Sequence, residues 1–286
     1  MAEKSPIEWT RGDDGAPGAT WNPTTGCDRI SPGCDHCYAL TLAKRLKAMG
    51  ASKYQNDGDL RTSGPGFGLS FHASALTQPL RWRKPRRVFV NSMSDLAHAR
   101  VSTDEIAQVF AVMTLASQHT FQLLTKRPKR LSRLLAEQSF WVRVRRAARE
   151  LGGPAADIGP AWGTGVLDNV WVGTSIESED YAWRADRLRE TPAAIRFLSL
   201  EPLLGPLPNL DLDGIDWVIV GGESGQQHRP LDLGWVRELR DQCVTQQVPF
   251  FFKQVGGRTP KAGGRMLDGR TWDEYPPTRG PAVVTA

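Results

Sequence analysis

The most regular feature of the chain is a series of short apolar runs, each ending in a polar cluster and followed by a helical pattern. Six of the runs are nearly continuous in apolar residues, and a weaker seventh (ATWNPTTGC) lies nearest the N-terminus. Strands that are covered on both faces have this pattern, whereas half-exposed strands alternate apolar and polar residues. We therefore predict buried strands within residues 19–27, 88–96, 120–128, 170–178, 195–203, 216–225 and 249–257.

Helix-start signals lie between these runs. Ser102, with Glu105 three residues later, forms a capping box ahead of an apolar-periodic stretch. Ser178 and Asp232 open two further helical stretches, and Gly50 is placed to end an earlier one. Repeated strand–helix alternation is typical of parallel βαβ units. The predicted fold class is therefore α/β, as a partial or complete parallel (β/α) barrel or a doubly wound sheet.

Two stretches interrupt the alternation. Residues 51–80 are rich in Gly, Ser and Asp, and residues 138–168 carry WVRVRRAARELGGPAADIGPAWG. We interpret both as insertions over one end of the sheet, and residues 258–286 as an irregular C-terminal tail. Because α/β barrels commonly reach this length as one domain, we predict that residues 1–257 form a single barrel domain.

Composition limits the class of protein. Of the 286 residues, 40% are hydrophobic and 23% are charged, which is the balance of a soluble globular chain. The N-terminal sequence MAEKSPIEWT has no apolar signal region, and no apolar run approaches the roughly 18 residues of a membrane span. We therefore expect neither secretion nor a membrane partner, and predict a cytoplasmic protein.

Three of the four cysteines lie close together in the sequence. Cys27, Cys34 and Cys37 form a C-x6-C-x2-C motif, whereas Cys243 is distant and is expected to pack in the core. Clustered thiols in a chain without a secretion signal indicate a metal site, of zinc or iron–sulfur type. Three thiolates leave one coordination position open for substrate chemistry. The alternative is a closed structural zinc site, with a fourth ligand from His36, His72 or Cys243.

The cysteine motif occurs together with several other distinctive strings. WNPTTGCDRISPGCDHCYA is followed by NSMSDL, LLTKRP, WVGTSIES, LSLEPLLGP and GGESG, from Trp21 through Gly257. As a set, these strings resemble the phage three-Cys-motif protein family, long described only as a phage protein of unknown function. That family is similar to a divergent branch of the radical S-adenosylmethionine (SAM) enzymes.

The resemblance implies a radical-SAM-like barrel in which Cys27, Cys34 and Cys37 ligate a [4Fe–4S] cluster. SAM would bind the fourth iron and be cleaved on reduction to methionine and a 5′-deoxyadenosyl radical. The resemblance also implies an external electron donor, a separately encoded three-Cys-motif partner protein and, for a phage-encoded chain, the host cytoplasm. The first gap of this motif is six residues where the superfamily pattern has three, and His36 stands where an aromatic residue near the adenine is usual.

Polar residues stand where two of the predicted strands end. Asn91, Ser94 and Asp95 close the second run, where the resemblance places the amino group of SAM. Ser175 and Glu177 close the fourth run, where it places the ribose hydroxyls. The alternative for the serine and aspartate residues of the second run is helix capping or a turn.

Four further charged residues follow or end other strands, and we predict them as catalytic: Lys126, Glu201, Glu223 and Lys253. Polar groups at consecutive parallel strand ends converge on one cavity. The alternative for Glu201 and Lys253 is an ion pair within the barrel mouth. Around Glu223, GGESG lacks the length and the Lys-Ser/Thr of a P-loop, so its glycines predict a close backbone approach to a ligand.

Positive charge is concentrated in residues 81–87, 126–133 and 143–149, with Trp82 and Trp141 among them or beside them. Such clusters track phosphates while aromatic rings stack on bases, and the isoelectric point near 9.2 agrees. The predicted function is a divergent radical SAM iron–sulfur enzyme that modifies or repairs a nucleic acid or nucleotide in a phage-related pathway. The alternatives are a zinc-stabilised nucleic-acid-binding protein without radical chemistry, and a scaffold for a partner.

Overall fold

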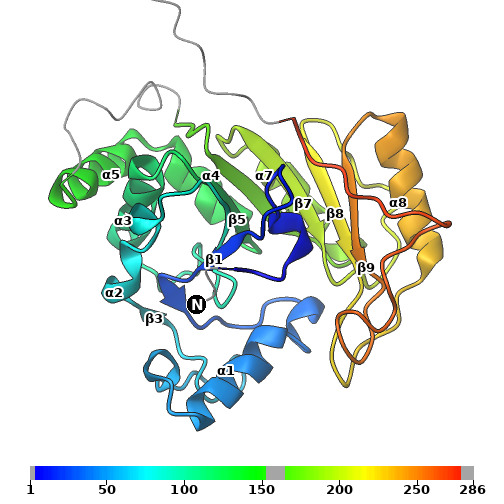
Figure 1. Ribbon diagram of the computed structural model, residues 1–286, viewed down its shortest axis with the longest axis horizontal. Helices are drawn as coiled ribbons and strands as arrows, with labels where there is room; N and C mark the ends of the chain where they lie inside the picture. The colour runs from blue at the N-terminus through cyan, green and yellow to red at the C-terminus, as the bar shows by residue number, and fades with distance from the viewer. Residues whose placement is uncertain (1–3, 153–164, 278–286) are drawn as a thin grey trace, which may run out of the picture.

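The computed structural model describes residues 4–152 and 165–277, and its central feature is a curled sheet of seven parallel strands (Figure 1). Each strand pairs with the next strand of the sheet along the chain, and each overlaps one of the predicted runs. The strands are β1 (Ala19–Trp21), β4 (Arg87–Val90), β5 (Thr120–Thr125), β6 (Val170–Ser175), β7 (Ile195–Leu200), β8 (Trp217–Gly221) and β9 (Phe250–Gln254).

The sheet is a half-barrel, so the partial form of the predicted barrel is confirmed and the complete form is wrong. In the described part of the chain, β1 and β9 do not pair with each other. The C-terminal segment instead covers the free edge of β9, where the Phe252 amide donates to the carbonyl of Trp272 at 2.9 Å. The described residues form seven parallel strands, one fewer than the closed (β/α)8 barrel has.

The helices begin largely where the sequence predicts. Helix α3 (Thr103–Leu115) starts at a complete capping box between Ser102 and Glu105. Helix α8 (Leu233–Thr245) starts where the Asp232 carboxylate accepts the Gly234 amide at 2.7 Å. Ser178 makes no side-chain cap, and a 3-10 turn separates it from the next helix. The other α-helices in the described residues are α1 (Tyr38–Ala48), α2 (Ala73–Leu76), α4 (Pro128–Ala136), α5 (Gln138–Glu150) and α7 (Trp183–Arg189).

Two apolar cores lie on opposite faces of the sheet. The larger one packs between the sheet and the outer helices, where Phe140 of α5 stacks edge-on against Phe110 of α3. The smaller one fills the concave face around Trp9, which belongs to the N-terminal 3-10 helix η1 (Glu8–Thr10) and contacts Phe89 and Trp217. The N-terminal segment lies within the curve of the sheet (Figure 1). It therefore fills part of the half-barrel interior.

The interrupting stretches contribute short elements. Residues 51–80 contain strand β3 (Ser70–Phe71), which pairs antiparallel with β2 (Thr24–Thr25) and so lies beside the cysteine motif. Residues 138–168 contain α5, and 153–164 of that range lie outside the described residues. Residues 258–277 form no helix or strand. Among the described residues, no helix is both long and apolar enough to cross a membrane.

Candidate functional site

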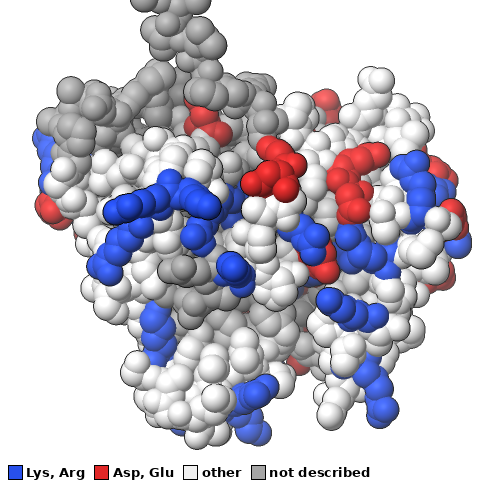
Figure 2. All heavy atoms as spheres, in the orientation of Figure 1, with Lys and Arg blue, Asp and Glu red and all other residues white. Residues whose placement is uncertain are grey.

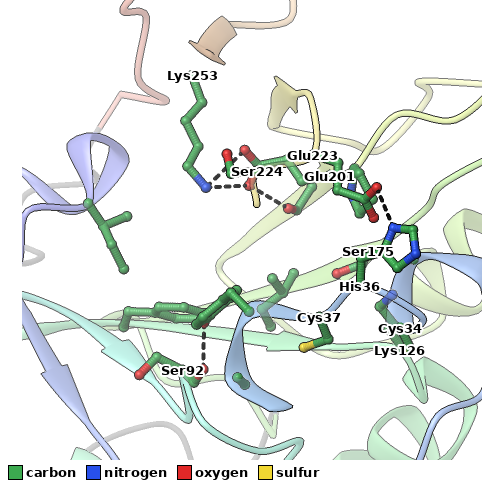
Figure 3. A pocket seen from close by; sticks show the side chains of 18 of the residues that line it. Cys34, His36, Cys37, Ser92, Lys126, Ser175, Glu201, Glu223, Ser224 and Lys253 are labelled. Carbon is green, nitrogen blue, oxygen red and sulfur yellow. Dashed lines mark hydrogen bonds and ion pairs between the residues drawn. The ribbon is translucent and has the colours of Figure 1, made fainter. Parts of the chain in front are cut away.

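A cavity of about 1030 Å³ opens at the carboxyl ends of the parallel strands (Figure 3). Side chains at or just after the ends of β4 to β9 line it, together with the cysteine motif, the N-terminal segment and residues 259–265. All three clustered cysteines are among the lining residues. Active sites of parallel α/β barrels lie at this edge, because the βα loops converge there.

The cysteine loop, residues 26–37, is fixed to the sheet from several sides. The Gly26 amide donates to the Met93 carbonyl at 2.9 Å, and the Ser31 hydroxyl donates to Glu177 at 2.6 Å. Gly26 adopts a φ of 88°, and a Cβ there would lie 2.3 Å from the Gly68 carbonyl oxygen. Only glycine therefore lets the loop pass under the 51–80 insertion.

The three thiols lie in different electrostatic surroundings. Burial raises the pKa of Cys27 to about 12, although Arg127 donates to its sulfur at 3.6 Å. Burial also raises the pKa of Cys37. Burial acts in the same direction on Cys34, but Lys126 and hydrogen bonds within the loop outweigh it, so the pKa of Cys34 is lowered. Of the three thiols, only Cys34 is therefore shifted toward the thiolate, whereas burial keeps Cys27 and Cys37 protonated.

The three cysteines line one cavity, but within the described residues they do not form a metal-ligand cluster. In residues 4–152 and 165–277, no group of three or more His, Cys, Asp or Glu side chains is gathered closely enough to hold a metal ion. The three candidates for a fourth ligand are engaged elsewhere. His36 pairs with Glu223 at 3.1 Å, His72 bonds Thr25 at 2.8 Å, and Cys243 is fully buried in α8. The donor set fits an iron–sulfur or zinc site in kind, because three thiols line one cavity, but the thiols are not gathered into a site in this structure.

Asn91, at the end of β4, has an unsatisfied side chain. It is 3% exposed and lines the cavity, and neither its amide nitrogen nor its carbonyl oxygen has a hydrogen-bond partner within the described structure. Its φ of 62° is unusual for a residue with a side chain. An unpaired buried amide costs about 1–3 kcal/mol, so Asn91 points to a ligand that pairs with it.

Ser94 and Asp95 are engaged within the protein. The Ser94 hydroxyl lies 2.7 Å from that of Thr24 and donates to the Thr24 carbonyl at 3.0 Å. Asp95 accepts from the Thr125 hydroxyl at 2.7 Å, and also from Arg127 and the amides of Ala97 and Lys126. Four donors take up this carboxylate. Asp95 therefore does what the sequence left as the alternative: it closes the turn after β4.

Glu177 does not line the cavity. Its side chain is fully buried behind the cysteine loop, where it accepts from Ser31, Lys126 and Arg184. Glu177, which the resemblance places near the ribose hydroxyls, instead connects the cysteine loop to the ends of β5 and β6. Ser175, expected in the same role, does line the cavity.

The charged residues at the later strand ends form two pairs. Lys253 lies 3.1 Å from Glu201, which confirms the predicted alternative of an ion pair in the mouth. Glu223 accepts from His36 and from the Arg229 side chain and amide. Burial alone would raise the pKa of Glu223, but the hydrogen bonds from Arg229 and His36 lower it to about 2. Figure 3 shows Lys253 pointing at Glu201 and His36 at Glu223.

Two of the three glycines of GGESG, Gly221 and Gly222, approach protein atoms closely, whereas a Cβ at Gly225 would have no atom within 4 Å. A Cβ at Gly221 would lie 2.4 Å from a Glu201 carboxylate oxygen, and one at Gly222 would lie 1.9 Å from the Val255 carbonyl oxygen. The predicted close backbone approach occurs, but the atoms approached belong to residues just after the neighbouring strands β7 and β9. These glycines are needed for packing β8 against the ends of β7 and β9.

The basic segments do not form the predicted stacking surface. Trp82 and Trp141 are 8% and 4% exposed and belong to the large core, so their rings are not available to bases. Arg143 and Arg146 pair with Asp104 on α3. Figure 2 shows Lys and Arg side chains in several separate groups on this face. Because the aromatic rings are buried, a proposal that this protein binds a polyanion has to name the individual Lys and Arg side chains that would make the contacts.

Sequence reasoning overlooked two residues of the cavity region. Tyr38 lines the cavity directly after the last cysteine, and its hydroxyl donates to the Ser92 carbonyl at 2.5 Å. Its position directly after the cysteine motif was a signal in the sequence that could have marked it as a cavity residue. Arg229 clamps Glu223 and donates to the Pro32 carbonyl at 2.9 Å. It lies in a loop without a motif, so only the fold brings it there.

The fold and the site define an α/β half-barrel protein with a thiol-lined cavity at the carboxyl edge of its sheet. Residues 4–276 match the family described as a protein of unknown function (DUF5131). Because this match covers nearly the whole chain, the protein belongs to that family. The comparisons with curated proteins and with solved structures gave no match.

Proposed function

We propose that the protein is a radical SAM iron–sulfur enzyme that acts on a nucleic acid or nucleotide, as the phage three-Cys-motif resemblance implies. One observation carries the proposal: three thiols of a single loop line a cavity at the carboxyl edge of a parallel half-barrel. A [4Fe–4S] cluster held by Cys27, Cys34 and Cys37 would supply the electron that cleaves SAM. The open coordination position would face the cavity.

The charges around the loop support this assignment. Lys126 and Arg127 lie beside Cys34 and Cys27, where they would stabilise thiolates and the negative charge of a cluster. Glu177 holds Lys126 in place and also binds Ser31 of the loop. Lys126 thus positions and neutralises the sulfur ligands in this proposal, rather than acting as an acid or base.

The cavity also has polar groups suited to SAM and a substrate. Asn91 offers an unpaired donor and acceptor, and Ser175 lines the wall two strands away. The ion pair of Glu201 and Lys253 lies in the mouth, where it would bind a polar group of the substrate. Ligand pockets commonly measure about 300–1,000 Å³, so 1030 Å³ leaves room for a second molecule. An oxygen-sensitive cluster and free thiols fit the expected cytoplasmic location.

The test is anaerobic reconstitution with iron and sulfide. The reconstituted protein should be brown, give the electron paramagnetic resonance signal of a reduced [4Fe–4S] cluster, and cleave SAM after dithionite reduction. Cys34→Ala should lose most of the iron and all SAM cleavage, because one ligand is missing. Cys243→Ala is the matched control: it removes a thiol that is buried in α8 and should leave the iron content unchanged.

A colourless protein with about one zinc per chain and no iron uptake would contradict the proposal. That result would establish the zinc-stabilised alternative. It would also require a fourth protein ligand, although His36, His72 and Cys243 are all engaged elsewhere in the structure.

A further inference from the structure

The cavity has an uncompensated positive charge. Four of the acidic residues that line it are paired with a cation: Asp28 with Arg100, Asp95 with Arg127, Glu201 with Lys253, and Glu223 with Arg229. Glu8 is the fifth, and the described residues give it no ion pair. Three lining cations, Arg11, Arg29 and Lys261, likewise have no carboxylate partner within the described chain.

These three cations are exposed and belong to three different segments that line the cavity. Arg29 belongs to the cysteine loop, Arg11 to the N-terminal segment, and Lys261 to the C-terminal segment that follows β9. Cations contributed by three segments of one lining suit a ligand that carries its negative charges at more than one point. A nucleic-acid strand does so, with one phosphate per nucleotide.

The cavity also offers an aromatic surface. Tyr38 is 55% exposed and lines the cavity next to Cys37, with its hydroxyl held by the Ser92 carbonyl. A half-exposed aromatic ring whose hydroxyl is held in place is a platform on which a base can stack. The sulfur of Cys37 points into the same cavity (Figure 3). A base on Tyr38 would therefore lie near the proposed cluster.

We infer that the cavity takes a nucleotide unit of a single-stranded nucleic acid, with Arg11, Arg29 and Lys261 binding its phosphates. The inference rests on the proposed function and names its substrate class. A paired and stacked base cannot enter a walled cavity without leaving its duplex, so an unpaired strand is the favoured form. Phosphates position such a strand, and the ring of Tyr38 accepts a base without reading its sequence.

The experiment measures binding of a short fluorescein-labelled single-stranded oligonucleotide to the reconstituted protein by fluorescence anisotropy, over a range of salt concentrations. The triple variant Arg11→Gln/Arg29→Gln/Lys261→Gln should bind at least about tenfold more weakly at low salt. It should also lower the slope of log affinity against log salt by about 2, because each phosphate contact contributes about 0.7 for a single strand.

The matched control removes three exposed cations that do not line the cavity. The variant Arg81→Gln/Arg83→Gln/Lys84→Gln loses the same charge from one of the basic segments. Its affinity should stay within about twofold of the parent. Equal weakening in both variants would mean general charge attraction, and would overturn the inference. Binding to the oligonucleotide that is no tighter than to adenosine monophosphate would overturn it as well.

The binding assay needs no reductant, so it is independent of radical chemistry. SAM cleavage is measured on the same preparations, and iron content shows whether Arg29→Gln disturbs the neighbouring cysteines. Oligonucleotide binding through these cations without SAM cleavage would support this inference and reject the proposed reaction. SAM cleavage without oligonucleotide binding would do the reverse.

Discussion

At the residue scale, the buried carboxylates of the site serve the protein rather than a ligand. Asp95, Glu177 and Glu223 are each 6% exposed or less, and each is surrounded by donors. A buried carboxylate is strongly destabilising unless cations and hydrogen bonds compensate it. Each of the three therefore recruits Arg or Lys side chains, and these contacts fix the strand ends and the cysteine loop. Asn91, which recruited none, is the better ligand candidate.

Glu223 gives a prediction about pH. Its pKa is lowered from 4.5 to about 2, so its stabilising effect is present above pH 4.5 and is lost as the pH falls toward 2. Glu223→Gln should lower the free energy of unfolding at pH 7 by on the order of 2–3 kcal/mol. Near pH 3, most of the difference from the parent should be gone.

Urea unfolding followed by circular dichroism at both pH values measures this. Glu190→Gln is the control, because Glu190 makes an ion pair with Arg187 in which both side chains are about half exposed. It should change the stability by less than about 1 kcal/mol at either pH. A Glu223→Gln deficit that is equally large near pH 3 would show that the effect is packing rather than charge.

At the element scale, the cysteine loop is pressed against the ends of β5 and β6. A Cβ on Gly33 would lie 2.6 Å from the Glu177 Cγ and 3.0 Å from the Lys126 Nζ. The loop therefore has no room to move toward the sheet. Because the three thiols are not gathered in the structure, binding of the proposed cluster would have to draw them together by movement within the loop itself.

Gly33→Ala tests how closely loop position and iron binding are linked. The added methyl group should push the loop away from Glu177, lower the stability by about 1–3 kcal/mol and reduce iron uptake. Gly205→Ala is the matched control, because the atom nearest to its Cβ is 3.8 Å away. Urea unfolding and iron content are measured for both variants. If Gly33→Ala takes up iron like Gly205→Ala, the loop is not held as tightly as these contacts indicate.

At the scale of the whole molecule, the half-barrel depends on its terminal segments. Residues 272–274 cover the edge of β9, and the Trp217 indole donates to the Glu274 carbonyl at 2.8 Å. Trp9 fills the concave core from the other end of the chain. A seven-stranded open sheet would otherwise expose an unpaired edge and an aromatic interior, which is a route to aggregation.

Truncation tests this dependence. A chain that ends at residue 257 should aggregate or unfold, because β9 loses its edge partner and Trp217 loses its cover. A chain that ends at residue 277 keeps every contact described here and should behave like the parent. Size-exclusion chromatography and thermal unfolding separate the two. A monomeric 257-residue chain with an unchanged melting temperature would show that the terminal segment is dispensable.

The elements that sequence predicted well are those with local causes. The seven runs form strands as predicted, because a strand buried on both faces needs apolar residues at consecutive positions, and such a run can be recognised in the sequence. The Ser102–Glu105 cap formed because both partners lie within one turn. Ser178 carries a similar signal, yet the chain takes a 3-10 turn there before α7. Trp82 and Trp141 lie within or beside basic segments, which predicted exposed stacking rings, but both rings are buried in the large core.

The sequence by itself determined an α/β chain with parallel strands and a cysteine loop after the first of them. Only the tertiary structure decided whether the barrel closes, which carboxylates face the cavity, and where the candidate fourth ligands lie. The physical reason is how far apart in the sequence the interacting residues lie. Strand and cap signals act between near neighbours, whereas polar pairing depends on residues that folding alone brings together. Ser31 and Glu177 are 146 positions apart in the chain, and the Ser31 hydroxyl lies 2.6 Å from the Glu177 carboxylate.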